Sequence, residues 1–125
     1  MGKENLIQSD VERRLVWLCA VEDIEEEDCI QILPDDLPPL AVYRVSGDEI
    51  YVTEDTCTHG QASLGEEGYL DGHIIECTWH DGRFDIRTGE VVAMPCEKPL
   101  KTFPVTVKDG DVYVSVQEST PEIIE

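Results

Sequence analysis

Short apolar segments separated by turn residues recur along this chain, and this pattern constrains its fold more than any other feature. In the clearest case Val105 and Val107 alternate with polar neighbours, Val112 and Val114 do the same, and Asp109-Gly110 lies between the two segments. Such alternation predicts strands with one buried face, and Asp-Gly is favoured in two-residue hairpin turns. Helical periodicity is hard to find. The pattern predicts an all-β protein, an antiparallel sandwich or small barrel, with strands at 15–19, 29–33, 41–45, 50–53, 73–77, 83–86, 90–93, 102–107 and 112–116.

Size and charge narrow the class of protein. The chain has 125 residues, enough for one domain, with 28 acidic against 9 basic residues and a formal charge of −19. This charge argues against nucleic acid and against an anionic membrane surface, because both require clustered Lys and Arg. A hydrophobic fraction of 41% is sufficient for a core. We therefore expect a folded acidic domain whose partners are basic at the contact.

The apolar runs and the cysteines indicate a cellular compartment. The longest run, Leu15–Val21, is far shorter than the ~20 residues of a membrane span, so a cytoplasmic location is expected. The odd number of cysteines, five, is untypical of a disulfide framework. Cys19 and Cys29 are predicted to pack as small hydrophobic residues. Cys57 and Cys77 differ, because each has a histidine close by.

Those two cysteines belong to the segments that carry chemistry. Cys57-Thr58-His59 and Cys77-Thr78-Trp79-His80 give C-x-H, then 17 residues, then C-x-x-H. Two thiolates and two imidazoles form a metal-binding set. Structural zinc sites usually begin with a close pair of cysteines, whereas here each segment supplies one Cys and one His. This arrangement suits two metal atoms better than one, as in a [2Fe–2S] cluster with two Cys on one iron and two His on the other, the Rieske type.

Other interpretations of these residues stay open at this point. A zinc-stabilised interaction module would use the same four side chains. A thiol enzyme would pair Cys57 with His59, but no third orienting residue is evident. His73 follows a glycine and is predicted to be an exposed strand residue, and Cys96 is predicted to be a buried or half-exposed thiol rather than a ligand.

The chain resembles the Rieske-type [2Fe–2S] ferredoxin components of bacterial multicomponent systems that hydroxylate aromatic rings with dioxygenases. The resemblance covers roughly 15–116. It rests on the paired Cys/His motifs and on flanking segments at 54–60, 70–72, 75–77, 80–85, 87–89, 95–99 and 103–105.

The resemblance implies a site and a role. Cys57 and Cys77 would bind the inner iron of one [2Fe–2S] cluster, and His59 and His80 the outer iron. It implies an electron carrier rather than an enzyme, a monomer that takes electrons from an NADH-dependent flavoprotein reductase and passes them to a terminal Rieske oxygenase, with neither nucleic acid nor membrane as partner. The alternative within the same superfamily is the Rieske small subunit of another reductase or oxidase.

The resemblance also implies an architecture. A single domain, 1–125, would have a small cluster-binding β subdomain at about 55–100 on an antiparallel base formed by 14–54 and 101–117, with flexible tails at both ends. Pro95–Pro99 would be the proline loop that covers the cluster.

Residues absent from the motifs indicate the redox level. High-potential members add a cysteine to each ligand loop and place Ser and Tyr where this chain has Gly82 and Phe84. Neither Gly82 nor Phe84 can donate a hydrogen bond from its side chain, so a low reduction potential is expected.

Two groups of charged residues lie outside the Cys/His motifs. Six of the seven residues in Glu22–Asp28 are acidic, and this stretch is either a solvated loop or a surface that steers a basic partner. Basic residues gather in the expected cluster region, at Arg83, Arg87, Lys98 and Lys101.

Overall fold

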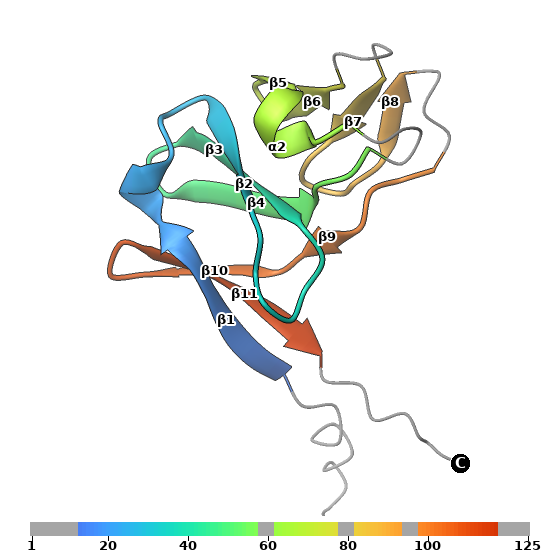
Figure 1. The fold of residues 1–125 in the computed structure, drawn as a ribbon. Helices are drawn as coiled ribbons and strands as arrows, with labels where there is room; N and C mark the ends of the chain where they lie inside the picture. The colour runs from blue at the N-terminus through green and yellow to red at the C-terminus, as the bar shows by residue number, and fades with distance from the viewer. Residues whose placement is uncertain (1–12, 58–61, 78–81, 94–97, 118–125) are drawn as a thin grey trace, which may run out of the picture.

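The computed structural model describes residues 13–57, 62–77, 82–93 and 98–117, which form three antiparallel sheets (Figure 1). The first sheet has the order β1 (Arg13–Ala20), β11 (Asp111–Gln117), β10 (Val105–Lys108). The second has the order β2 (Asp28–Ile32), β3 (Leu40–Ser46), β4 (Glu49–Glu54), β9 (Thr102–Phe103). The third has the order β5 (Tyr69–Asp71), β6 (Ile74–Glu76), β7 (Arg83–Asp85), β8 (Val91–Ala93). The all-β, antiparallel prediction is confirmed.

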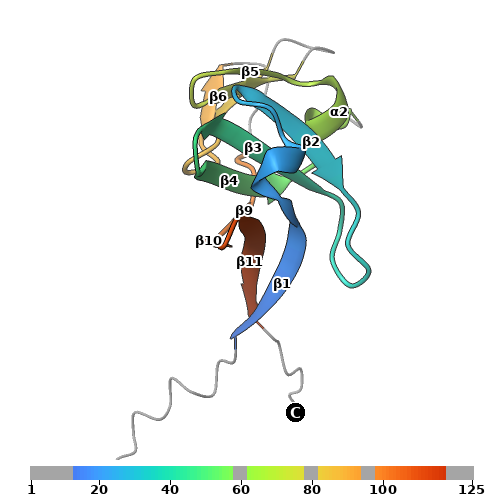
Figure 2. The ribbon, with the colours of Figure 1, turned by 90° about the vertical axis from the view of Figure 1, so that its left-hand side faces the viewer.

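The second sheet lies between the other two, as two perpendicular views show (Figures 1 and 2). Side chains alternate between the faces of a strand, and β3 is buried on both faces. Its residues Leu40 and Val42 belong to the core shared with the first sheet, whereas Ala41 and Tyr43 belong to the core shared with the third. All four side chains are fully buried. The central sheet therefore packs against the first sheet with one face and against the third sheet with the other.

The C-terminal hairpin forms at the predicted turn. Asp109 and Gly110 have φ values of 54° and 81°, and they connect β10 to β11 as the two central residues of a tight turn. Positive φ at both positions fits a type I′ turn, which matches the twist of the flanking strands.

The single strand predicted at 102–107 is wrong, because it divides at Pro104. Its first part, β9, pairs with β4 in the second sheet, and its second part, β10, pairs with β11 in the first. Proline has no N–H to donate to a ladder, although the Pro104 carbonyl still accepts a hydrogen bond from the Ser115 N–H at 3.0 Å. The chain thus passes from the second sheet to the first at a proline, which cannot donate a ladder hydrogen bond.

Three short elements were not predicted. They are a 3₁₀ turn, η1 (Val21–Asp23), a one-turn helix, α2 (Leu64–Glu67), and the strand β5. In α2 the Ser63 hydroxyl accepts a hydrogen bond from the Glu66 N–H and caps the first turn. Elements of three or four residues are too short to produce a periodic hydrophobic pattern.

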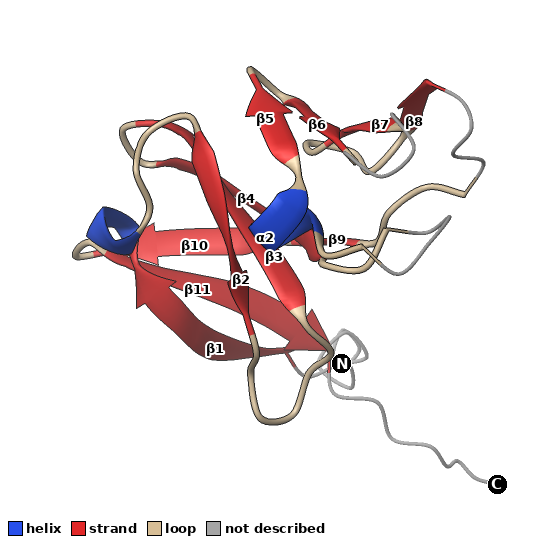
Figure 3. Cartoon of the chain, turned by 45° about the horizontal axis from the view of Figure 1, so that its top comes forward, coloured by secondary structure: helices blue, strands red, loops and turns tan. Residues whose placement is uncertain are grey.

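Figure 3 shows the third sheet at one end of the molecule, with α2 at its junction with the second sheet. Residues 55–100 contain α2 and all four strands of this sheet. The boundaries of the expected subdomain remain a prediction. Within the described ranges, no helix is long and apolar enough to cross a lipid bilayer.

Candidate metal centre

The structure buries Cys57 and Cys77 in one apolar cluster between the second and third sheets. Each is 1% exposed. Cys57 follows β4 and Cys77 follows β6 directly, so the two thiols arrive from different sheets. They share their cluster with Tyr43, Leu64 and Phe84, all fully buried. Two cysteines distant in sequence are therefore placed in one water-excluding environment.

Each of these cysteines opens a loop that is closed in the same way. The Cys57 N–H donates to the Ala62 carbonyl at 3.0 Å, and the Cys77 N–H donates to the Gly82 carbonyl at 2.8 Å. Outside the first closure lies a bridge between Thr56 and Ser63, and outside the second lies the β6–β7 pairing. The segments 58–61 and 78–81 are thus enclosed between matching backbone hydrogen bonds.

The two predicted histidine ligands, His59 and His80, fall within those enclosed segments and lie outside the described residues. Cys96 and most of the predicted proline loop also lie outside them. Of the predicted ligand set, the structure therefore places Cys57 and Cys77, and the roles of His59 and His80 remain predictions.

The two placed cysteines fit an iron–sulfur cluster. Sulfur is a soft ligand that favours such clusters, and both thiols are buried beside apolar side chains that would keep water away. Each also begins a loop whose sequence supplies an imidazole two or three residues later. This donor set, two sulfurs and two nitrogens from paired loops, is that of a Rieske [2Fe–2S] cluster.

The other two described cysteines behave as predicted. Burial raises the pKa of the Cys19 thiol to about 11 and that of Cys29 to about 12, in each case with help from nearby carboxylates. Both therefore stay protonated at neutral pH. The Cys29 thiol donates to the Leu64 carbonyl at 3.5 Å, and both residues belong to the cores. Their role as small packed hydrophobic residues is confirmed.

His73 is not the exposed strand residue predicted from the sequence. It lies half-buried in the turn between β5 and β6, with Nε2 2.7 Å from Glu49 Oε2. Tyr51 donates its hydroxyl to the same oxygen at 2.7 Å and meets the His73 ring edge-on, with 5.7 Å between ring centroids. These hydrogen bonds, His73 first, lower the pKa of Glu49. The prediction failed because the partner, on β4, is distant in sequence.

Three of the basic residues near the third sheet have neighbouring partners. Arg87 forms two hydrogen bonds to the Asp85 carboxylate, which raise the pKa of Arg87 and lower that of Asp85. Arg83 lies 3.8 Å from Glu76, and the Lys101 ammonium lies over the Phe103 ring. The carboxylates of Asp85 and Glu76 partly offset the positive charges of Arg87 and Arg83.

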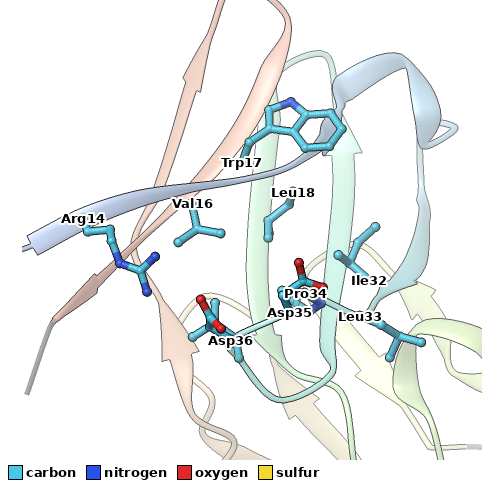
Figure 4. Close-up of a pocket in the computed structure, with 10 residues that line it drawn as sticks. Arg14, Val16, Trp17, Leu18, Ile32, Leu33, Pro34, Asp35 and Asp36 are labelled. Atoms are coloured by element: carbon cyan, nitrogen blue, oxygen red, sulfur yellow. The ribbon is translucent and has the colours of Figure 1, made fainter.

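A groove on the base of the molecule contributes nothing to the centre. It lies between β1 and the segment that follows β2 (Figure 4). Val16 and Leu18 line one side, and Ile32, Leu33 and Pro34 the other. None of its lining residues is a cysteine or histidine.

Comparisons with known proteins agree with this geometry. Residues 14–104 match the Rieske [2Fe-2S] domain. The ferredoxin component of the p-cumate 2,3-dioxygenase system of Pseudomonas putida is 48% identical over 112 residues, which is 90% of this chain and 94% of that protein. The solved Sphingomonas yanoikuyae B1 ferredoxin superposes with a TM-score of 0.77 at 45% identity, over 82% of this chain and 99% of that one.

A further solved structure is a complex of reduced oxygenase and oxidised ferredoxin in carbazole 1,9a-dioxygenase. It matches with a TM-score of 0.74 at 48% identity and covers 81% of this chain and 92% of the matched one. The chain therefore belongs to the Rieske [2Fe-2S] family and is an electron-transferring ferredoxin that carries one such cluster, not a catalytic subunit.

Proposed function

We propose that this ferredoxin carries single electrons from an NADH-dependent flavoprotein reductase to the terminal oxygenase of a system that hydroxylates aromatic rings. We further propose that Cys57, His59, Cys77 and His80 hold its cluster. The observation that supports the site best is the pair of buried cysteines at the start of two loops with the same closing hydrogen bond.

In this proposal the protein's own residues perform three tasks. Cys57 and Cys77 bind as thiolates and His59 and His80 as neutral imidazoles, and the bound cluster supplies one-electron exchange. The backbone closures at Ala62 and Gly82 hold each loop at a fixed width. The buried ring of Phe84 excludes water from the cysteine side. The histidine side would then be the route by which electrons enter and leave.

The partners are inferred from the relatives. One relative is named as the ferredoxin component of a dioxygenase system, and another ferredoxin has been solved together with an oxygenase. An oxygenase acceptor for this chain follows by analogy, and the reductase donor is the partner that such a carrier needs. Because NADH is an intracellular reductant, a cytoplasmic location belongs to the same proposal. We also propose that the carrier is a monomer.

A low potential forms a separate part of the proposal. Gly82 contributes its carbonyl to the loop closure, and Phe84 is fully buried in the cysteine cluster. Neither offers a side-chain donor that would stabilise the reduced cluster, so the midpoint should lie near the low end of the Rieske range of about −150 to +300 mV. Redox titration measures it, and a midpoint above roughly +100 mV on that scale would contradict this part.

Metal analysis and spectroscopy test the ligand set. Purified protein should be red-brown, with equal iron and acid-labile sulfide and a Rieske electron paramagnetic resonance (EPR) spectrum in the reduced state. His59→Ala and His80→Ala should each lose that spectrum, and His73→Ala, the matched control, should keep it. A colourless preparation containing zinc would overturn the proposal in favour of a zinc-stabilised module.

A reconstituted chain of electron transfer tests the role. Reduced protein should be oxidised by a ring-hydroxylating oxygenase in single turnover, and the Cys57→Ser variant should not support this transfer. Failure of the intact, cluster-containing protein to exchange electrons with any such oxygenase would point to another Rieske partner.

A further inference from the structure

A buried carboxylate lies beside the first ligand loop. Asp55 is 2% exposed, although it precedes Cys57 by only two residues. Its Oδ1 accepts hydrogen bonds from the Ser63 hydroxyl at 2.9 Å and the Gly65 N–H at 2.8 Å. Its Oδ2 accepts one from Gln31 Nε2 at 2.9 Å. Within the described part of the chain, its partners are therefore neutral donors.

These donors come from two elements beside the loop, β2 and α2 with its N-cap. Gln31 is on β2, Ser63 caps α2, and Gly65 is in α2. The main chain of Asp55 is tied to the same region, because the Leu64 N–H donates to its carbonyl at 2.8 Å. Asp55 stands before the loop, and Ser63 and Gly65 stand after it. The carboxylate thus joins both ends of the first ligand loop to each other and to β2.

Close packing makes this junction sensitive to displacement. A Cβ added to Gly65 would stand 2.6 Å from Gln31 N and 2.7 Å from Ile30 O, so the α2 backbone rests directly on β2. The second ligand loop has a weaker flanking pair, in which Arg83 is half-exposed and lies 3.8 Å from Glu76. The two loops therefore close alike but are anchored differently.

Burial of the Asp55 carboxyl group costs hydration free energy. A buried charge that is bonded only to neutral donors loses more hydration energy than a buried amide would. An asparagine at position 55 would keep the bonds from Ser63 and Gly65 and, after rotation of the Gln31 amide, one bond to Gln31, at the cost of the 3.3 Å bond from Gln31 to Ser63. The charge is therefore the main property that distinguishes aspartate from asparagine at this position.

We propose that Asp55 is a positioning residue that fixes the first ligand loop on β2 and α2, and that its buried negative charge favours the oxidised cluster. Reduction adds a negative charge at the proposed cluster, whose ligand Cys57 follows Asp55 by two residues, and a buried charge is screened less by solvent and salt than a surface one. The inference rests on the proposed ligand set and adds to it the group that sets loop position and potential.

Two kinds of variant distinguish the effect of loop position from the effect of the Asp55 charge. Asp55→Asn removes the charge and keeps the shape, and Gln31→Leu removes the link to β2 and keeps the charge. Ser63→Ala tests the link to α2 if the Gln31 variant fails to fold. Asp48→Asn, an exposed residue in the β3–β4 turn, is the control for loss of one carboxylate.

Midpoint potential and the rate of cluster loss to a chelator are the two readouts. Asp55→Asn should shift the midpoint to a more positive potential than Asp48→Asn does, with cluster loss close to the wild-type rate. Gln31→Leu or Ser63→Ala should lose the cluster about tenfold faster, the lower end of typical outer-shell effects.

Hydrogen exchange at the Gly65 amide, which donates to Asp55, adds a readout that is independent of redox chemistry. Its protection should fall in Asp55→Ala. Equal midpoints in Asp55→Asn and Asp48→Asn would overturn the role of the charge. Wild-type rates of cluster loss in both loop variants would overturn positioning. Absence of a Rieske spectrum in the wild-type protein would instead overturn the proposed function, so the two failures are distinguishable.

Discussion

The four described cysteines are all buried, but their backbone surroundings differ. Cys19 and Cys29 are surrounded by apolar side chains, and burial raises the pKa of each thiol. Cys57 and Cys77 are equally buried, but each opens a loop whose backbone folds back on it. Burial alone therefore does not distinguish a proposed ligand from a packed cysteine, whereas the loop closure after Cys57 and Cys77 does.

Substitution of each kind of cysteine should show this difference. Cys29→Ala should keep a full complement of iron and lower the free energy of unfolding by about 1 kcal/mol, because one packed sulfur is lost. Cys57→Ala and Cys77→Ala should each abolish cluster binding. Iron analysis and thermal unfolding are the measurements, and loss of the cluster in Cys29→Ala would contradict this division.

Gly89 is a second residue whose role depends on its surroundings. It has φ of 81°, and its carbonyl accepts a hydrogen bond from the Leu100 N–H at 2.8 Å. A Cβ here would meet the Leu100 carbonyl. Gly89 thus lets the segment that follows the predicted proline loop lie directly on the turn between β7 and β8.

Gly110 provides a matched control for Gly89, because it has the same φ of 81° with nothing near its Cβ position. Gly110→Ala should lower the free energy of unfolding by about 1 kcal/mol, the cost of positive φ for an L-residue. Gly89→Ala should lower it by about 2 kcal/mol more, because a methyl group is forced against backbone. Equal losses by denaturant unfolding would show that the contact with Leu100 is unimportant.

At the scale of elements, Glu49 connects the central sheet to the third sheet. It begins β4, and its carboxylate bonds to Tyr51 on the same strand and to His73 in the β5–β6 turn. The pKa of this exposed carboxyl is lowered from 4.5 by the His73 hydrogen bond first and the Tyr51 hydrogen bond second. The contact therefore depends on the ionised form of Glu49.

This dependence predicts how stability varies with pH. A carboxyl whose pKa is lower in the folded state stabilises the fold above its unfolded value, and the contribution is lost as pH falls through the folded value. Wild type should thus exceed Glu49→Gln in melting temperature at pH 7, and the gap should narrow below about pH 4.5. The control is Glu22→Gln, in the exposed acidic stretch. A gap that stays constant between pH 7 and pH 4 would rule out this contribution.

At the scale of the whole molecule, the acidic stretch at 22–28 is held by contacts within the base, where Glu26 accepts a hydrogen bond from the Gly47 N–H at 3.3 Å. This stretch begins in η1, on the side of the base away from the third sheet, and ends at the start of β2 (Figures 1 and 3). Arg44 holds this stretch locally, through a hydrogen bond to the Ile24 carbonyl at 2.8 Å and a contact with Glu26 at 3.7 Å. These local contacts favour the solvated-loop interpretation over direct contact with a redox partner.

Neutralising this stretch should therefore have little effect on electron transfer. The triple variant Glu22→Gln/Glu25→Gln/Glu27→Gln should transfer electrons to an oxygenase within about twofold of the wild-type rate at 0.15 M ionic strength, where screening acts over about 8 Å. Glu66→Gln on α2, beside the first ligand loop, is the comparison that should change the rate more. A severalfold decrease in the triple variant at that salt concentration would revive the steering interpretation.

Much of this architecture could be predicted from the sequence, because alternating valines and the Asp-Gly turn are local signals. The division of 102–107 between two sheets could not, because it depends on which strands lie on either side of Pro104. Likewise, Cys57 and Cys77 could be identified from spacing, whereas Asp55 could not. Its importance comes from donors at positions 31, 63 and 65, which meet only in the folded chain.

The central claim is that two cysteines and two particular histidines hold one binuclear cluster. Pulsed EPR of the reduced protein, with ¹⁵N-labelled histidine, counts the imidazole nitrogens coupled to the cluster. The account predicts two couplings in the wild-type and His73→Ala proteins, and no Rieske signal in His59→Ala or His80→Ala. A wild-type cluster with no histidine coupling, or one whose coupling disappears with His73, would contradict it.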